Sequence, residues 1–528
     1  MDDPKASRPI HRPTRRTALR SLAVGVALLV TTAPAADAAR AATAAEPATY
    51  TLTIHHLGRD GRPTSGYETH VIGVSGPGAD RTEAPYDASG TTTLRLPKGR
   101  YLLDATFTGS DAVDWLVQPR LDLTRDTAVT LDARRTSPVD VRPPDASAEF
   151  VNSGVYLVVG SGPGARLSNR MFAHPGIRIG QQGPAAEPGT VRQTYDSYWR
   201  NGSTTYALGY VSTGSRAMDG LVRRPALRDL AALEVRAAAR PGTEGEVVVD
   251  LMPSQGPTIG VPAKFRAPAT AEFLVTPERG AWDLLYRAPL VGEARPTIYP
   301  ALGLNLRAGT RTVHAFDNAV FGPQLSDRPA LVQDGDQLTL DVAMLADGDG
   351  HVPWSPAFTS ATTTLSRDGK AVGTATDAPG QGSFTVPPGK ADYRLTSSVE
   401  RGGAPGTATV VTADWTFSTR AATTGPTPLP LSVVRFSPAL RGDGSAPADA
   451  ALRLPVTVRG AAADGRHRSL GVSYSLDGGA SWRQLPVRQG AVTVPATGRE
   501  TGVSLRAELT DLGGNTLTQT VVDAYRTR

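Results

Sequence analysis

Short turns punctuate this chain along nearly its whole length, and this spacing leaves room for strands but little room for long helices. Glycine and proline supply 55 and 43 of the 528 residues. Between the turns, segments such as residues 51–54 and 91–96 alternate polar with apolar side chains. Alternation with a period of two places one side of a strand in a core and the other in solvent. The pattern predicts an all-β fold of tandem β-sandwich modules.

The chain contains no cysteine. Small secreted domains often depend on disulfides, so cores of sufficient size must stabilise this chain instead. After removal of a leader, about 490 residues remain, a length that corresponds to three to five domains. Several independent cores are therefore expected.

Residues 1–38 have the features of a cleavable signal peptide. Arg15 and Arg16 form a basic head, residues 21–30 are apolar, and residues 36–38 read Ala-Asp-Ala, a small-x-small cleavage site. The paired arginines are those of a twin-arginine export signal, and an ordinary secretory leader with a basic head is the alternative. Both interpretations predict a secreted, extracellular protein without a membrane span.

The positive charge of the chain is concentrated in this leader. Residues 1–38 contribute +3 of the formal net charge of +5, which leaves +2 on residues 39–528. No cluster of basic residues interleaved with aromatic residues follows. The composition therefore argues against nucleic acid as a partner.

Composition and turn signals divide the remaining chain into four modules. Turns at residues 60–63, 87–90 and 97–100 give the first module a resemblance to transthyretin-like or carboxypeptidase-regulatory-like domains. Asp368-Gly369, within residues 367–370, predicts a tight hairpin. Residues 226–239 fit a helix by composition and a strand by alternation. The predicted modules are a transthyretin-like sandwich at 48–141, a larger jelly-roll-like sandwich at 146–325, a third sandwich at 326–419, a linker at 420–430 and an immunoglobulin-like sandwich at 431–528.

The order of several short motifs points to one family. These motifs are Asn-Ala-Val-Phe-Gly-Pro at 318–323, Arg-Asp-Gly-Lys at 367–370, Asp-Trp-Thr-Phe at 414–417, the segment 473–482 and Asp-Leu-Gly-Gly-Asn at 511–515. In this order they resemble the non-catalytic C-terminal half of large secreted subtilisin-like serine peptidases of actinobacteria. In those peptidases a catalytic domain precedes such modules, whereas here the leader runs directly into them. The resemblance implies an accessory role beside a peptidase.

The residues themselves agree with a non-catalytic chain. A subtilisin-like enzyme needs an Asp in D-[ST]-G, a His in H-G-T-H and a Ser in G-T-S-x-A, and the sequence contains none of these. It also lacks G-x-S-x-G, H-E-x-x-H and Walker-type motifs. We therefore expect that the protein is not an enzyme and needs no cofactor, and that it acts in binding, in adhesion or in support of a peptidase. A carbohydrate-binding or carbohydrate-active protein and a degenerate or split peptidase are the alternatives.

The densest aromatic segment offers a candidate ligand site. Tyr195, Tyr198 and Trp199 surround Asp196, and Tyr206 and Tyr210 follow. Exposed rings of this kind stack on sugars or anchor a protein partner, while buried rings are sandwich core. The alternation of side chains along a strand leaves both interpretations open.

Asp347 and Asp349 lie on a glycine-rich loop, residues 347–351. Two carboxylates there offer oxygen ligands to calcium, which needs six to eight of them. No further acidic residue completes a known calcium loop. A solvated turn is the alternative to a calcium site.

Residues 475–482 match the Asp-box pattern S-x-D-x-G-x-[ST]-W of sialidases. In that pattern the aspartate binds turn amides and the tryptophan packs beneath the turn. Asp477, Gly479 and Trp482 are accordingly predicted to build a structural hairpin turn and not a catalytic site.

Overall fold

A computed structural model describes residues 47–528 apart from several internal segments. The predicted signal peptide, residues 1–38, lies outside the described residues. The internal segments not described are 110–111, 239–245, 254–260, 267–268, 278–281, 289–296, 402–407 and 420–424.

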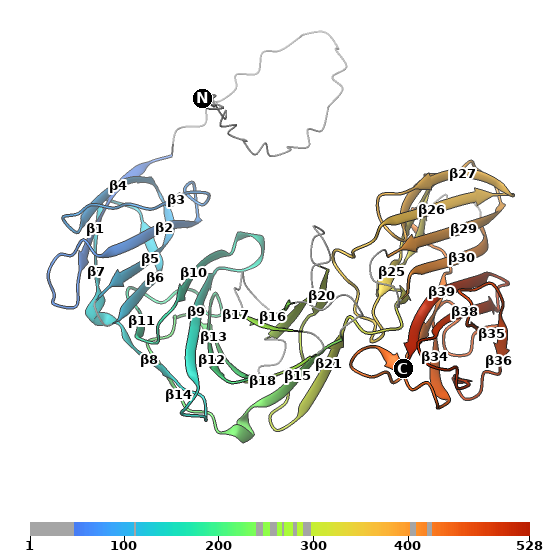
Figure 1. Cartoon of the computed structure of the whole chain (residues 1–528). Helices are drawn as coiled ribbons and strands as arrows, with labels where there is room; N and C mark the ends of the chain where they lie inside the picture. The colour runs from blue at the N-terminus through green and yellow to red at the C-terminus, as the bar shows by residue number, and fades with distance from the viewer. Residues whose placement is uncertain are drawn as a thin grey trace, which may run out of the picture. The chain divides into compact units, whose positions relative to one another are not determined.

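The prediction of an all-β fold is confirmed. The described residues form 39 β-strands and only three 3-10 helices, η1 (Ala133–Arg135), η2 (Gly162–Gly164) and η3 (Leu227–Asp229) (Figure 1). Within the described part of the chain, no helix has the length and apolar character needed to cross a bilayer. The strands are arranged in sheets that pack face to face around apolar cores.

Two sheets form the N-terminal sandwich. Leu52 and Ile54 of one sheet and Leu103 and Leu116 of the other belong to one buried cluster. The smaller sheet has the order β4 (Thr91–Pro97), β1 (Thr49–Leu57) and β7 (Thr127–Asp132). The larger has the order β14 (Leu221–Arg223), β8 (Ser137–Val141), β11 (Ile177–Gln181), β6 (Val113–Leu123), β5 (Gly99–Thr108), β2 (Tyr67–Ser75) and β3 (Thr82–Glu83).

The larger sheet extends across the predicted boundary between residues 141 and 146. Strand β11 pairs in parallel with β6 from Ile177 opposite Val113 to Gln181 opposite Val117. Strand β14 pairs in parallel with β8 in the same way. Parallel partners lie far apart in sequence, so local turn signals cannot locate them. The first two predicted modules therefore share one hydrogen-bonded sheet.

The next pair of sheets contains the predicted aromatic site. The longer sheet has the order β10 (Arg166–Phe172), β9 (Glu149–Val159), β12 (Val191–Asn201), β13 (Thr204–Gly214), β18 (Ala269–Val275), β15 (Ala231–Ala237) and β21 (Arg311–Phe316). The shorter has the order β17 (Val261–Arg266), β16 (Glu246–Pro253), β19 (Trp282–Arg287) and β20 (Ile298–Ala301).

Residues 226–239, for which helix and strand were both open, form η3 and then β15 in their described part. Ala231, Leu233 and Val235 are fully buried at alternate positions. Strand β15 pairs with β18 on one side and β21 on the other. Burial of every second side chain between two strands favours the extended conformation over the helix that alanine content suggests.

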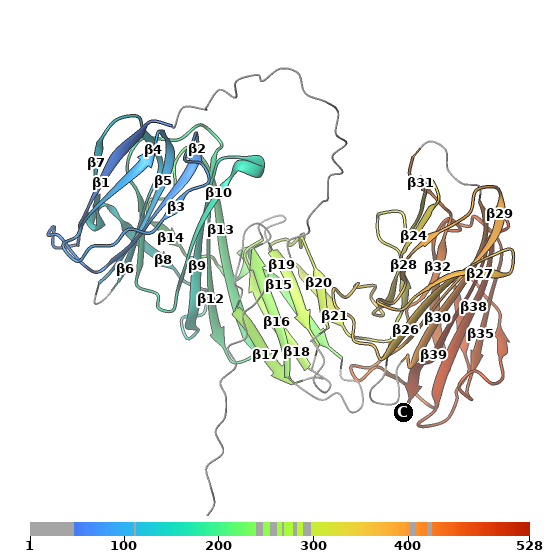
Figure 2. The same ribbon diagram turned by 90° about the horizontal axis from the view of Figure 1, so that it is seen from above.

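The C-terminal half is built around one nine-stranded sheet. Its order is β27 (Lys370–Ala375), β26 (Ser360–Arg367), β29 (Ala391–Glu400), β30 (Val410–Thr419), β39 (Thr516–Thr527), β38 (Gly502–Asp511), β35 (His467–Ser475) and β36 (Arg483–Leu485), with β33 (Ser445–Ala446) also on β39 (Figure 2). The smaller sheets are β22 (Gly322–Gln324) with β25 (Ala343–Ala346); β28 (Gln381–Thr385), β24 (Gln337–Asp341), β23 (Leu331–Asp334) and β31 (Thr427–Pro428); and β32 (Ser432–Phe436), β34 (Leu452–Gly460) and β37 (Ala491–Val494).

This sheet also extends across a predicted module boundary. Strand β30 pairs with β39 in seven consecutive positions, from Val410 opposite Val522 to Thr416 opposite Thr516. The predicted linker 420–430 is in part a strand, since Thr427 and Pro428 pair with β23. Its residues 420–424 lie outside the described residues. The third and fourth predicted modules are therefore joined by backbone hydrogen bonds.

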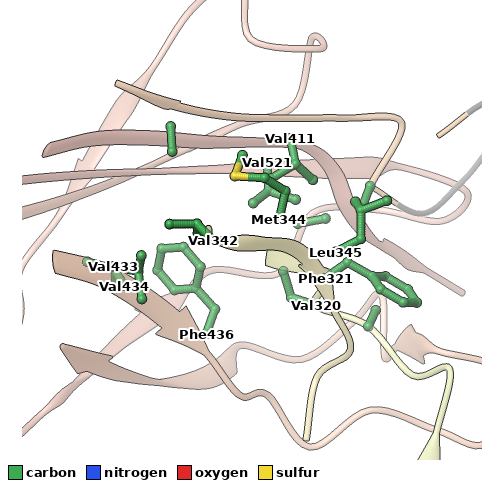
Figure 3. Packing of buried hydrophobic residues seen from close by; sticks show 14 of the residues in the cluster. Val320, Phe321, Val342, Met344, Leu345, Val411, Val433, Val434, Phe436 and Val521 are labelled. Carbon is green, nitrogen blue, oxygen red and sulfur yellow. The ribbon is translucent and has the colours of Figure 1, made fainter. Parts of the chain in front are cut away.

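A shared apolar core accompanies this shared sheet. Figure 3 shows Phe321, Met344 and Leu345 in the same cluster as Val411, Phe436 and Val521. These six side chains are at most 3% exposed. They come from the predicted second, third and fourth modules, so burial of apolar surface stabilises the three segments together.

Candidate functional sites

The aromatic segment lies on β12 and is buried. Tyr195 is 3% exposed, Tyr198 1% and Trp199 4%. Tyr195 and Trp199 pack into one core cluster, whereas Tyr198 packs into another. Successive side chains of a strand point to opposite faces of the sheet, so Tyr198 lies on the other side from Tyr195 and Trp199. The sheet uses both of its faces as core, so of the two interpretations these rings fit sandwich core and not an exposed ligand site.

Asp196 is the one carboxylate inside this segment and is also fully buried. It lies opposite Gly154 of β9 and Gly209 of β13. A Cβ on Gly154 would stand only 2.6 Å from Asp196 Oδ1, so the glycine makes room for the carboxyl group. Burial raises the pKa of Asp196 to about 7, because the charged carboxylate loses its hydration, and the nearby polar groups of Tyr198 and Gly154 oppose this rise. The predicted ligand residue Asp196 is thus part of the protein interior.

The loop that carries Asp347 and Asp349 forms a different kind of polar centre. Asp347 is fully buried, and its Oδ1 accepts a hydrogen bond from the backbone N–H of His351 at 2.9 Å. Its Oδ2 lies 3.0 Å from Nδ1 of His351 and accepts a bond from the backbone N–H of Asp317 at 3.2 Å. Burial raises the pKa of Asp347, while the His351 contacts lower it. Both carboxylate oxygens are therefore engaged by N–H groups.

This arrangement contradicts the predicted calcium site. A calcium ion needs several oxygen lone pairs directed at one point, but the oxygens of Asp347 face protein hydrogens. Asp349 is exposed, and its Oδ1 accepts a bond from Nδ2 of Asn318 at 3.3 Å. Among the described residues, no group of three or more potential ligands converges on a metal position. Asp347 instead fixes the loop, as a turn-forming carboxylate does.

Arg435 of β32 completes the polar centre from the other side. Its side chain is only 6% exposed. Nη1 donates to the carbonyl of Gly322 at 2.8 Å, and Nη2 donates to the carbonyl of Asp347. Burial lowers the pKa of Arg435 to about 10, and the nearby Asp347 carboxylate opposes that shift. The guanidinium remains charged at neutral pH and connects β22, the Asp347 loop and β32.

His351 is oriented by this centre. Asp347 bonds to its Nδ1, the contact that orients an imidazole in many hydrolases. The His351 ring packs against Phe316 with 4.3 Å between the ring centroids and lies 5.9 Å from the ring of His314. Burial lowers the pKa of His314. These contacts make the Asp347–His351 pair part of the packing around β21.

Asp477 lies in a tight turn between β35 and β36. Its Oδ1 accepts bonds from the Ser475 hydroxyl at 2.6 Å and the Ser481 backbone N–H at 2.9 Å. These bonds hold the pKa of Asp477 well below its usual range. Gly479 has a φ of +98°, and the guanidinium of Arg506 lies 4.1 Å from the Trp482 ring centre. The contacts are those of a structural turn.

Sequence reasoning did not find Arg435 or Gln519. The Gln519 amide, on β39, accepts from the Val434 backbone N–H at 3.0 Å and donates to the Val434 carbonyl at 2.7 Å. It therefore substitutes for a neighbouring strand. A signal was present for Arg435, because an arginine inside the apolar run Val433-Val434-Arg435-Phe436 indicates a buried charge. Gln519 carried no comparable local signal.

The fold and these sites describe an all-β protein in which buried polar side chains connect neighbouring sheets. No protein-family model and no curated protein matches the chain. Among solved structures, it is similar to the Bacillus anthracis TIE protein (12% identity, TM-score 0.13, 51% of this chain and 50% of that one). It is also similar to BcpA, the major pilin subunit of Bacillus cereus (10% identity, TM-score 0.13, 51% and 99%). A third is a tetra-tandem repeat from the extending region of a large adhesion protein (13% identity, TM-score 0.12, 90% and 100%).

The chain spans about half the length of the TIE protein. TM-scores of this size carry no inference about shared function.

Proposed function

We propose that this chain is a secreted, non-catalytic scaffold that binds a partner outside the cell, in adhesion or in support of a subtilisin-like peptidase. The observation that carries the proposal is the continuity of sheets across the predicted module boundaries. Strands β30 and β39 pair over seven positions, and β6 pairs with β11 over five. Backbone hydrogen bonds thus join the segments on either side of these boundaries, as a structural scaffold requires.

The buried polar centre supports the same role. Arg435 donates to backbone carbonyls on both sides of one boundary, at Gly322 and at Asp347. Gln519 bonds to both backbone groups of Val434. Charged and amide groups committed to backbone partners stabilise a junction. The polar side chains in this region are thus occupied by structural contacts.

The carbohydrate alternative depended on the aromatic segment of β12. Tyr195, Tyr198 and Trp199 are each less than 5% exposed, so their faces are closed to a sugar. The proposal therefore retains protein partners as the first class to test.

The direct test uses the purified mature chain, residues 39–528, and an active-site-blocked subtilisin-like peptidase as the probe. Biolayer interferometry measures binding, and a fluorophosphonate labels any activated serine. We expect saturable binding and no labelling. An unrelated serine hydrolase serves as the labelling control. A labelled serine in the chain would overturn the proposal that the protein is non-catalytic. If the chain bound neither the peptidase nor whole actinobacterial cells, the proposed binding role would be overturned.

A further inference from the structure

A pocket of about 770 Å³ opens between the end of β13 and strand β14. Residues 210–212 of β13 and 221–223 of β14 line it, together with Asp219 of the connecting loop. Tyr210, unlike the three rings of β12, is only half-buried. This pocket is separate from the Asp347 centre and from the Asp477 turn.

The end of β13 presents an open strand edge to this pocket. Strand β18 pairs with β13 only from Thr204 to Ala207. The Thr276 hydroxyl then bonds to both the N–H and the carbonyl of Gly209, which therefore point away from β12. Backbone groups repeat their direction every second residue of a strand. Val211 and Thr213 consequently direct an N–H and a carbonyl outward, and none of the described residues bonds to them.

The opposite wall contributes a positive charge. The carbonyl of Arg223 accepts from the Arg142 N–H at 3.2 Å, so the backbone groups of Val222 face away from β8. Nη1 of Arg223 donates to the Val222 carbonyl at 2.9 Å. Its guanidinium also lies 5.4 Å from the centre of the Tyr210 ring. The arginine therefore covers the aromatic ring that a sugar would need and offers a charge instead.

The loop between the two walls is held in place by the protein interior. Gln193, which is 1% exposed, accepts from the backbone N–H of Met218 at 2.5 Å. Gln181 accepts from the backbone N–H of Ala217, and Gly220 donates to the carbonyl of Ile179 at 3.1 Å. A binding site whose walls are fixed before the ligand arrives loses less entropy on binding.

We infer that this pocket binds an extended, acidic segment of a partner protein, which adds as a strand to the edge of β13 at Val211 and Thr213. An extended backbone presents donors and acceptors at the same two-residue spacing as this edge, and strand addition is an established mode of peptide recognition. Within residues 210–224, Arg224 is paired with Asp140, which leaves Arg216 and Arg223 against Asp219, and this excess of positive charge favours an acidic partner. The inference rests on the proposed binding role and assigns it a site.

The test separates the backbone edge from the side chains that surround it. A displayed library of random decapeptides is selected on the mature chain, and the affinities of the recovered peptides are measured for three variants. Thr213→Pro removes the outward N–H, whereas Thr213→Val keeps it and serves as the matched control. Thr213 is exposed and its N–H has no internal partner among the described residues, so the proline is compatible with the fold. Arg223→Glu reverses the charge.

We expect peptides rich in acidic and β-branched residues, with affinity about tenfold weaker for Thr213→Pro and close to wild type for Thr213→Val. Arg223→Glu should weaken the acidic peptides specifically. The inference would be overturned if no peptides were recovered or if Thr213→Pro bound them as well as wild type. It would also be overturned if the pocket bound glycans on an array instead of peptides. Peptidase or cell binding that persists unchanged in Thr213→Pro would reject this pocket and leave the proposed function in place.

Discussion

Replacement of Arg435 by methionine tests whether the junction between β22, the Asp347 loop and β32 is held by a buried charge. Methionine keeps most of the apolar stem and removes the guanidinium donors. The substitution leaves the carbonyls of Gly322 and Asp347 without their closest donors. Weaker contacts to Pro323 at 3.5 Å and Ala346 at 3.4 Å are lost as well.

The magnitude follows from these contacts. Hydrogen bonds to a charged group contribute about 1.5 to 3 kcal/mol each, and two of the four contacts have strong geometry. The cost of burying the guanidinium disappears in the variant and offsets part of this loss. The net destabilisation should therefore be about 2 to 4 kcal/mol. The loss should be local, with faster exchange of backbone amides in β22, β25 and β32.

The assay combines urea unfolding with hydrogen exchange read by mass spectrometry. Arg453→Met is the matched control, because Arg453 lies exposed on β34 and should change stability by less than about 0.5 kcal/mol. Hydrogen exchange is essential because a chain with several cores need not unfold in one step. Equal midpoints for the two variants, or unchanged protection at residues 322–324 and 432–436, would refute the argument.

Three further predictions concern the sites proposed from sequence. The wild type should lose roughly 4 kcal/mol of unfolding free energy as pH rises from about 4 to about 7, because Asp196, whose folded pKa is raised to about 7, stabilises the fold only while protonated. Asp196→Asn should abolish this loss, as measured by urea unfolding at each pH, and parallel stability curves for the two proteins would contradict the prediction. Trp199→Ala should lower the free energy of unfolding by about 3 to 5 kcal/mol in the same assay. The control Trp354→Ala, at a side chain that is 56% exposed, should lower it by less than about 0.5 kcal/mol, and similar effects of the two variants would mean that Trp199 is not part of the core. Asp477→Asn should accelerate hydrogen exchange of the Ser481 backbone amide relative to wild type, whereas the control Asp464→Asn, at another exposed turn, should not. Unchanged exchange at Ser481 in Asp477→Asn would show that Asp477 does not hold the turn.

Much of the local structure could be read from the sequence. Residues 91–96, expected to be a strand, lie in β4 (Thr91–Pro97). The Asp368-Gly369 pair, expected to form a tight hairpin, has φ values of +47° and +78° and joins β26 to β27. Both expectations rest on interactions within a few residues, where side-chain chemistry limits the backbone directly.

The candidate sites could be predicted less well, because burial is not a local property. Tyr195 and Trp199 alternate with Tyr198 along a strand, which would expose one set of rings if a single face were covered. The structure covers both faces. Asp347 reads as a cation ligand in a glycine-rich loop, but contacts from His351 and Asp317 occupy its oxygens. Only the folded chain shows that occupation.

The sequence by itself determined that this protein is built of strands, where some of them lie, and that no disulfide links them. Period-two alternation and turn residues are short-range signals, so these features needed no knowledge of the rest of the chain. The tertiary structure decided that the sheets continue from β30 into β39 and from β6 into β11. It also decided that Arg435 lies inside and that an edge of β13 stays open. These features depend on strands far apart in sequence, whose pairing is selected by the packing of the whole core.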